Sequence, residues 1–207
     1  MRRESLVRFC ERAAVRFHRA THLVMGFESA GDARRMMVDL KQRLAKFGLS
    51  LHEDKTRLIA FGRLPAMARQ QRGERRPETF AFLGFTHYCG WTRDGRFIVK
   101  RKTQSKRLTR KLKALRQDAW RLMHAPMAEQ QRRYASVLRD HYAYYGLPHN
   151  WRALNSFRQS LLLIWFRYLR RRSQKARRLG WERFKAMLER FPLPLPRITH
   201  PWAALMA

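Results

Sequence analysis

The sequence predicts an α+β fold in which a region of short strands precedes a basic, all-helical region. In the first hundred residues, short apolar runs end at glycines and turn residues, which is typical of strands. From Thr103 onward, apolar residues recur at three- and four-residue spacing, which is typical of amphipathic helices. With 45% hydrophobic residues, the 207-residue chain has enough apolar material to bury a core.

The first elements along the chain are a basic lead-in, a strand and a helix. The lead-in covers residues 1–18, and its weak apolar periodicity suggests a short helix. The apolar run at 23–25 then predicts a buried strand. Ser29 is a candidate N-cap for the helix that follows, and Gly48 is its expected stop.

Short strands and a loop come next. Residues 49–62 predict two short strands with a turn at 53–55 between them. Residues 65–78 are rich in arginine and contain two prolines and a glycine, so we interpret them as a mobile basic loop.

A β-hairpin and four helices complete the predicted elements. Asp94-Gly95 is a strong turn signal between the apolar segments 80–91 and 96–102. The apolar spacing then marks helices over residues 108–122, 134–145, 151–168 and 181–191. We therefore divide the chain into a lead-in (1–18), a strand-rich region (19–102) and a helical region (103–200).

Charge is the dominant property of the composition. The chain has 46 Lys and Arg but only 15 Asp and Glu, a net charge of +31. A polyanion that neutralises this charge is expected, and nucleic acid is the foremost candidate. An anionic membrane surface is the rival, but the basic residues alternate with aromatic ones and form no amphipathic helix with a uniformly apolar face. No apolar run reaches the roughly 18 residues of a membrane span, so we expect a cytoplasmic protein with no membrane partner.

The helical region carries most of the positive charge. Between Lys100 and Arg178 there are 22 Lys and Arg but only three acids. A solvated helix face would intersperse glutamates for i,i+4 pairing, and these are missing, so phosphate contact is the better interpretation. The predicted nucleic-acid-binding residues are Arg101, Lys102, Lys106, Arg107, Arg110, Lys111, Lys113, Arg170, Arg171, Arg172, Lys175, Arg177 and Arg178.

Four aromatic residues are further candidates for contact with bases. Tyr142, Tyr144, Tyr145 and Trp151 could stack on unpaired bases. Aromatic residues at helical spacing are more often part of a core, so this alternative stays open.

No catalytic or metal site is predicted from the residues. Cys10 and Cys89 have no CxxC companion, and His18 and His22 have no glutamate between them. The adjacent carboxylates Glu53-Asp54 stand beside a lysine, which suggests a turn rather than a magnesium site.

Three segments resemble a known family. They are LAKFGLSLHEDKTRLIAFGR at 44–63, ETFAFLGFTHYCG at 78–90 and LRDHYAYYGLP at 138–148. In this order and spacing they resemble the reverse transcriptase encoded by group II introns. The resemblance covers roughly residues 20–200 and implies a partial palm over 19–102, followed by a basic helical thumb or maturase bundle over 103–200.

The chain departs from this family at the catalytic motif. The family's Tyr-Ala-Asp-Asp aligns with Arg19, Ala20, Thr21 and His22, so both magnesium-binding aspartates are missing. Neither threonine nor neutral histidine replaces an anionic ligand for magnesium. The fingers and the first half of the palm have no counterpart upstream of residue 19. We therefore expect no catalytic residue and no cofactor in the isolated chain, with Mg²⁺ bound only if a complete polymerase site is assembled.

The resemblance implies an RNA-binding, maturase-like protein that helps a group II intron fold and splice. Intron RNA is then the expected partner, and a DNA primer-template is a further one. One alternative is half of a split RNA-directed DNA polymerase whose second chain supplies the fingers and palm. The other is a truncated remnant without function.

Overall fold

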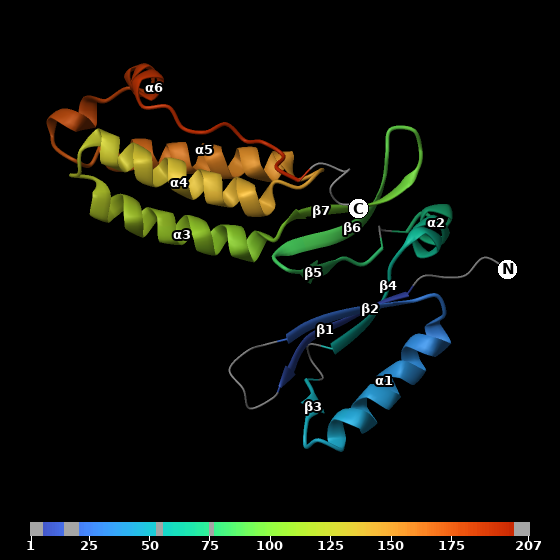
Figure 1. Cartoon of the computed structure of the whole chain (residues 1–207). Helices are drawn as coiled ribbons and strands as arrows, with labels where there is room; N and C mark the ends of the chain where they lie inside the picture. Colours follow the sequence, from blue (N-terminus) through green and yellow to red (C-terminus); the bar gives the residue numbers. More distant parts are fainter. Residues whose placement is uncertain (1–5, 15–20, 53–55, 75–76, 201–207) are drawn as a thin grey trace. The chain divides into compact units, whose positions relative to one another are not determined.

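The computed structural model describes an α+β protein. It describes the whole chain except residues 1–5, 15–20, 53–55, 75–76 and 201–207. Antiparallel strands precede a helical region, as the sequence predicts (Figure 1). The chain divides into two compact units, Met1–Lys100 and Arg101–Ala207, which are described separately below. Among the described residues, no helix is long and apolar enough to cross a membrane.

The first unit contains a four-stranded antiparallel sheet centred on one strand. β1 (Leu6–Ala14) pairs along one edge with β2 (Thr21–Phe27). Along its other edge β1 pairs first with β4 (Thr56–Ala60) and then with β3 (Ser50–Leu51). β3 and β4 therefore act as one interrupted strand, and the turn expected at 53–55 lies outside the described residues.

The helix expected within residues 1–18 is wrong. Residues 6–14 form β1, which gives backbone hydrogen-bond partners to β2 on one side and to β3 and β4 on the other. The partners of this strand lie up to about fifty residues away, at Thr56–Ala60. Local apolar spacing carries no information on such distant pairing, so it could not reveal the strand.

The first helix has the expected boundaries. α1 (Ala30–Ala45) begins after Ser29, whose Oγ accepts a hydrogen bond from the backbone N–H of Gly31 at 3.1 Å. Gly48 adopts a φ of 67°, and the next residue donates its N–H to the carbonyl of Leu44 at 2.9 Å, which ends the helix.

The loop expected at 65–78 is wrong over its first half. α2 (Arg63–Gln71) is a helix, and Pro65 fits its first turn because the N–H that proline lacks would have no intrahelical partner there. Ala66 is buried in the core of the unit, and the other apolar residues of α2 are partly buried, so the helix packs on the core through its apolar side. Residues 75–76 lie outside the described part of the chain.

A second antiparallel sheet contains β5 (Phe80–Phe82), β6 (Phe85–Trp91) and β7 (Phe97–Thr103). The β6–β7 turn is the predicted one, with Gly95 at a φ of 73°. Segment 80–91 is not one strand, however. Leu83 and Gly84, at φ of 46° and 82°, form a two-residue turn that joins β5 to β6 as a hairpin.

The two sheets and α2 share a core within the first unit. Its buried members are Ile59 of β4, Phe61, Ala66 of α2, Phe80 of β5 and Cys89 of β6. Partly buried aromatic and aliphatic side chains of β2, β6 and β7 pack around them. Cys89 is a buried free thiol, whereas the side chain of Cys10 lies outside the described residues.

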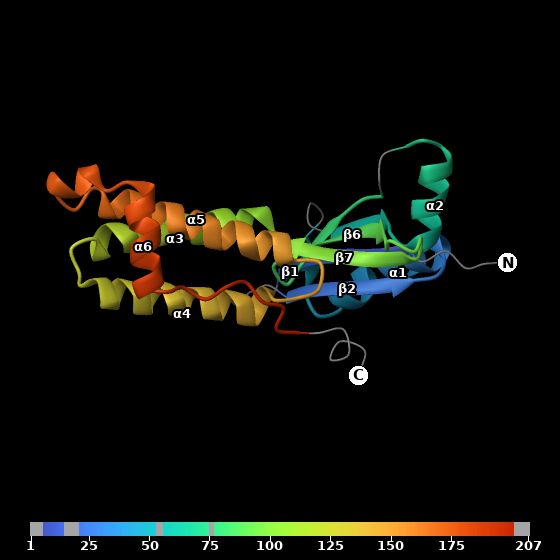
Figure 2. The ribbon, with the colours of Figure 1, turned by 90° about the horizontal axis from the view of Figure 1, so that it is seen from above.

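The second unit is built on three long helices, all at predicted places. They are α3 (Ser105–Leu122), α4 (Met127–Tyr145) and α5 (Trp151–Leu169). The chain runs up α3, back along α4 and up α5, so α3 and α5 lie side by side in the same direction (Figure 2). A short 3₁₀ helix, η2 (Lys175–Arg178), precedes α6 (Trp181–Arg190), which crosses the bundle.

Aromatic side chains dominate the core of this unit. Trp165 is fully buried between Tyr134 of α4 and Phe184 of α6, with ring centroids 5.1 and 5.9 Å away. The indole N–H of Trp165 donates to Oε1 of the buried Gln130 at 2.8 Å. The amide of Gln130 in turn donates to the carbonyl of Ala125 at 2.9 Å, which caps the turn between α3 and α4.

The segment after α6 is held on α4 and α5 mainly through backbone atoms. The carbonyl of Pro194 accepts hydrogen bonds from the hydroxyl of Tyr142 and from Nε of Arg158, both at 3.2 Å. Further on, the Thr199 hydroxyl donates to the carbonyl of Tyr142 at 2.8 Å, and the Thr199 N–H donates to the carbonyl of Gly146 at 2.9 Å. Residues 191–200 therefore form an ordered strap along the bundle.

Candidate nucleic-acid interface

The exposed side of α3 carries a row of cations. Lys106, Arg110, Lys113 and Arg121 follow one another at helical spacing with Gln117 between them, and all five are exposed. The opposite side of α3 packs through Leu115 and Ala119, which are buried. The amphipathic pattern of α3 therefore determines which of its cations face solvent.

α5 presents a second basic row. Its exposed residues include Arg152, Arg167 and Leu163, together with the neutral donors Ser156 and Gln159. α5 contains no carboxylate along its 19 residues. Arg170, at its C-cap, extends the row, with its guanidinium 5.6 Å from the ring centre of Phe166.

A shallow groove joins the two rows. It has a volume of about 190 Å³ and is lined by Arg116 of α3 and by Ser160, Leu163 and Arg167 of α5, among others. We define the α3–α5 face as the exposed cations Lys106, Arg110, Lys113, Arg116, Arg121, Arg152, Arg167 and Arg170. Among the described residues none of the eight forms an ion pair with a carboxylate.

The carboxylates of the second unit lie elsewhere. Residues 101–200 contain five acids, four of which are on α4 and α6. The fifth, Asp118, belongs to α3, and its carboxylate binds the guanidinium of Arg133 on α4 at 2.7 Å. Cations and acids are therefore segregated, and the α3–α5 face presents an uncompensated positive surface.

The structure separates the predicted binding residues into two groups. Arg101 and Lys102 lie at the end of β7, and those between Lys106 and Lys113 lie in the first half of α3, whereas those between Arg170 and Arg178 lie beyond the end of α5. Because α3 and α5 run in the same direction and α3 has 18 residues, the start of the first group lies roughly 27 Å along the bundle from the second, and Lys113, half-way along α3, lies roughly half as far. The structure therefore does not bring the two predicted groups together at one site.

One predicted residue points away from solvent. Lys111 is half-buried, and its ammonium lies 5.6 Å from the ring centre of Phe157 in the core. Burial lowers the pKa of Lys111, an effect that the carboxylate of Asp140 opposes. Lys111 is thus a poor candidate for phosphate contact, although its neighbours in the sequence are good ones.

Sequence reasoning missed four of the cations that connect the two groups. They are Arg116, Arg121, Arg152 and Arg167. Their signal was available, because Arg121, Arg152 and Arg167 fall on the side of their helix away from the buried apolar residues, and Arg116 falls beside it. The predicted residues are runs of adjacent cations, whereas the face consists of single cations about one helical turn apart.

The aromatic candidates divide between core and surface. Tyr142 and Tyr145 are buried, so they are not available to stack on bases. Tyr144 and Trp151 are about half exposed, and Trp120, which was not a candidate, is 61% exposed among the cations of α3. Base stacking therefore stays possible for the exposed three.

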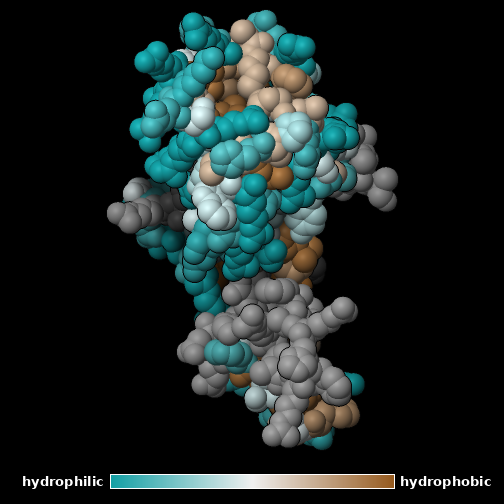
Figure 3. Space-filling model, turned by 90° about the vertical axis from the view of Figure 1, so that its left-hand side faces the viewer, coloured by the Kyte–Doolittle hydropathy of each residue, from teal (hydrophilic) through white to brown (hydrophobic). Residues whose placement is uncertain are grey.

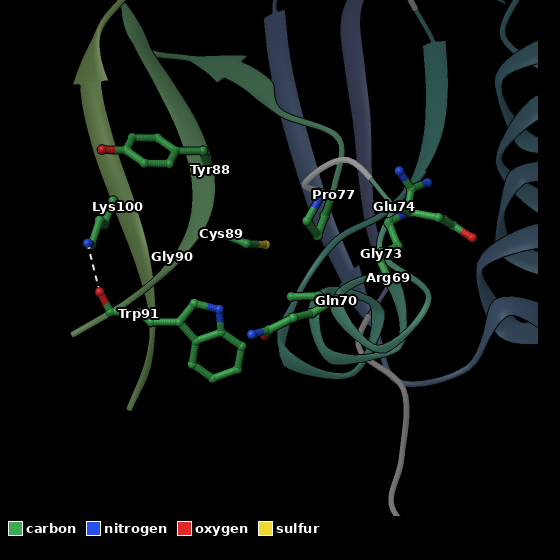
Figure 4. Close-up of a pocket in the computed structure, with 11 residues that line it drawn as sticks. Arg69, Gln70, Gly73, Glu74, Pro77, Tyr88, Cys89, Gly90, Trp91 and Lys100 are labelled. Carbon is green, nitrogen blue, oxygen red and sulfur yellow. Dashed lines mark hydrogen bonds and ion pairs between the residues drawn. The ribbon is translucent and has the colours of Figure 1, made fainter. Parts of the chain in front are cut away.

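A larger cavity, of about 550 Å³, lies in the first unit between α2 and strands β6 and β7 (Figure 4). Its cations already have partners. Lys100 donates to the carbonyl of Trp91 at 2.8 Å, and Arg69 lies 4.0 Å from the carboxylate of Glu74. This cavity therefore has much less free positive charge than the α3–α5 face.

The residues at the expected polymerase motif do not fit a magnesium site. Thr21 and His22 belong to β2, and by residue type they carry a hydroxyl and an imidazole rather than the carboxylates that Mg²⁺ prefers, although their side chains lie outside what the structure describes. Arg19 and Ala20 lie outside the described residues. In the part of the chain that the structure describes, no three His, Cys, Asp or Glu side chains are grouped closely enough to hold a metal.

Comparisons with protein families, with curated proteins and with solved structures found no match.

Proposed function

We propose that this chain binds structured RNA and that the α3–α5 face contacts the phosphates. The observation that carries the proposal is the two rows of exposed cations on α3 and α5, eight in all, none of which pairs with a carboxylate among the described residues. The one acid on these helices, Asp118, binds Arg133 of α4. A folded helix holds such cations in fixed positions, so little ordering entropy is lost when phosphates bind.

Neutral donors between the cations favour RNA over DNA. Gln117, Ser156 and Gln159 are exposed on the same helices as the cations. Their amide and hydroxyl groups can bond to the 2′-hydroxyl of ribose, which is the group that distinguishes RNA from DNA. Recognition of an A-form duplex by its shape requires this mixture of phosphate and 2′-hydroxyl contacts.

The natural partner that we propose is a group II intron RNA, which the chain would help to fold and splice. This part rests on the resemblance of the three sequence segments. Two of them lie at well-defined places in the fold, since Leu83-Gly84 forms the β5–β6 turn and Gly146 ends α4. The proposed role needs no catalytic residue in this chain.

The test compares two variants that each lose four positive charges. The first replaces Lys106, Arg110, Lys113 and Arg116 by Gln. The control replaces Arg132, Arg139, Arg190 and Arg197, which are exposed, outside the α3–α5 face and without an ion pair among the described residues. Binding of a structured RNA is measured by filter binding over a range of salt concentrations.

We expect the first variant to lose at least about tenfold more affinity than the control. Its plot of log K against log salt should also become shallower by about one unit for each phosphate contact that is lost. Equal losses of affinity in the two variants would mean that only net charge matters, and the proposed interface would then be wrong.

A further inference from the structure

A recess at the far end of the second unit combines cations with an apolar floor. It lies between the end of α5, η2 and the start of α6 and has a volume of about 370 Å³. Cavities for small organic ligands start at roughly this size. Figure 3 shows this end of the unit in its upper part, where hydrophobic patches are surrounded by hydrophilic side chains.

Four cations line the recess. Arg172, Lys175, Arg178 and Arg183 contribute to its wall, and no carboxylate does. Arg172 is held in place because its Nη2 donates to the carbonyl of His124 at 3.1 Å. None of the four forms an ion pair among the residues that the structure describes. The recess is therefore suited to a group with more than one negative charge.

The floor of the recess is apolar. Leu169 is buried at the end of α5, and Met127, Leu179 and Met187 are half-buried around it. Flexible methionine side chains adapt to flat rings of different shape. A ligand for this site should therefore have an apolar, planar part beside its negative charge, which is the chemistry of a nucleotide.

We propose that this recess, the end pocket, holds one unpaired nucleotide of the bound RNA. The base lies against Met187 and Leu179, and the phosphates on either side of it contact Arg172, Lys175 and Arg178. The exposed face of α5 leads directly to this site through Arg167 and Arg170. The inference rests on the proposed function, because it assigns to the same RNA a second contact beyond the α3–α5 face.

The experiment uses the full chain and two RNA probes. One is a blunt RNA duplex, and the other is the same duplex with an unpaired extension at each end. The test variant is Met187→Glu, which places a carboxylate in the end pocket without removing a cation. The control is Ala186→Glu, which makes the same charge change at the neighbouring exposed position of α6, outside the pocket.

We expect the unchanged protein to bind the extended duplex about tenfold more tightly than the blunt one, the size of one favourable base contact. Met187→Glu should abolish this preference, whereas Ala186→Glu should keep it. Thermal unfolding of both variants shows whether the fold is intact, and Met187→Gln, which keeps the net charge, provides a second test if Met187→Glu unfolds. Met187→Gln should weaken the preference because it makes the floor polar.

Three outcomes would overturn the inference. They are equal binding of both duplexes by the unchanged protein, a preference that Met187→Glu keeps, and a preference that both glutamate variants lose to the same extent. A third probe, vesicles of phosphatidylserine, distinguishes a lipid site, because vesicle binding that Met187→Glu abolishes and Ala186→Glu keeps would assign the pocket to an acidic lipid. Failure of the unchanged protein to bind either RNA would instead remove the proposed function itself.

Discussion

The side chain of Asn150 and the backbone and hydroxyl of Thr103 form a reciprocal pair of hydrogen bonds. Oδ1 of Asn150 accepts from the Thr103 N–H at 2.8 Å, and Nδ2 donates to the Thr103 Oγ1 at 2.9 Å. Nδ2 also donates to the carbonyl of Tyr145 at 2.8 Å. Asn150 thereby fixes the residues that precede α3 and α5 beside the end of α4, so that both rows of the α3–α5 face start at the same level.

The first prediction concerns Asn150→Asp, which keeps the size of the side chain but removes its donor. The carboxylate would then meet the carbonyl of Tyr145 in a buried position, so we expect a loss of about 2–4 kcal/mol in the free energy of unfolding. Urea unfolding followed by circular dichroism measures it. Asn155→Asp on α5, which makes the same charge change, serves as the control, and a similar loss there would contradict the assigned role.

The second prediction concerns the buried His141. Its ring stacks on Phe157 with centroids 3.9 Å apart, and neither ring nitrogen has a hydrogen-bond partner among the described residues. Burial, with a smaller effect of Lys111, lowers the pKa of His141 from 6.5 to about 3. Between these two values the unfolded chain binds a proton and the folded chain does not, so folding stability decreases as the pH falls through this range.

We expect His141→Phe to remove this contribution. The free energy of unfolding of the variant minus that of the unchanged protein should be roughly 2–3 kcal/mol larger at about pH 4 than at neutral pH. Chemical unfolding at a series of pH values measures the difference between the two curves. Curves that run parallel from neutral to acidic pH would show that His141 does not titrate differently in the two states.

The third prediction concerns Gly146, where the strap crosses the end of α4. A Cβ at this position would lie 2.3 Å from both the Thr199 Oγ1 and the carbonyl oxygen of Tyr142. Backbone atoms cannot move away cheaply, so Gly146→Ala should cost about 1–3 kcal/mol and loosen the strap. Gly180→Ala, where a Cβ meets nothing within 4 Å, is the control.

Thermal unfolding and limited proteolysis of residues 191–200 measure the two effects of Gly146→Ala. Faster cleavage of the strap in this variant, but not in Gly180→Ala, is the expected result. Unchanged cleavage would mean that the strap tolerates the added methyl group.

The fourth prediction compares two lysines that are two residues apart. Lys113 is exposed on the α3–α5 face, whereas Lys111 points toward Phe157. Both Gln substitutions remove one charge, but only Lys113→Gln should make the salt dependence of RNA binding shallower by about one unit. An equal effect of Lys111→Gln would show that the orientation of these side chains does not matter for binding.

The fifth prediction is that the isolated chain does not extend a primer on an RNA template with Mg²⁺ and deoxynucleotides. It follows from the donor groups of Thr21 and His22, which do not replace two carboxylates. Primer extension assays measure it. Template-dependent product that follows the purified chain through chromatography would show that catalytic carboxylates lie elsewhere in the sequence.

The long helices could be predicted because their signals are local. Leu115, Leu138 and Phe157 each belong to a set of buried residues that recur at helical spacing within one helix. Ser29 lies directly before α1 and marks its start. The structure departs from the sequence prediction where contacts between residues far apart in the sequence determine the secondary structure. β1 depends on strands far along the chain, and α2 depends on Ala66, one small side chain that fits the core.

The sequence predicts the basic character of the candidate site but not the positions of its residues relative to one another. An excess of cations after residue 100 was evident, but the packing of α3 beside α5, whose starts Asn150 joins, was not. Because the arrangement of α3 and α5 was unknown, the distance between Lys106 and Arg178 could not be predicted from the sequence. The inward position of Lys111 required its helical phase relative to Leu115, which a run of adjacent cations conceals.

The central place of β1 determines what trimming of the N-terminus would do to the protein. Removal of residues 1–14 would expose a further edge on each of β2 and β4, where β1 now supplies hydrogen-bond partners. Open strand edges recruit strands from other molecules. Shortened versions of the chain should therefore self-associate and precipitate, although such a cut would remove only a few of the 46 basic residues that keep the molecules apart.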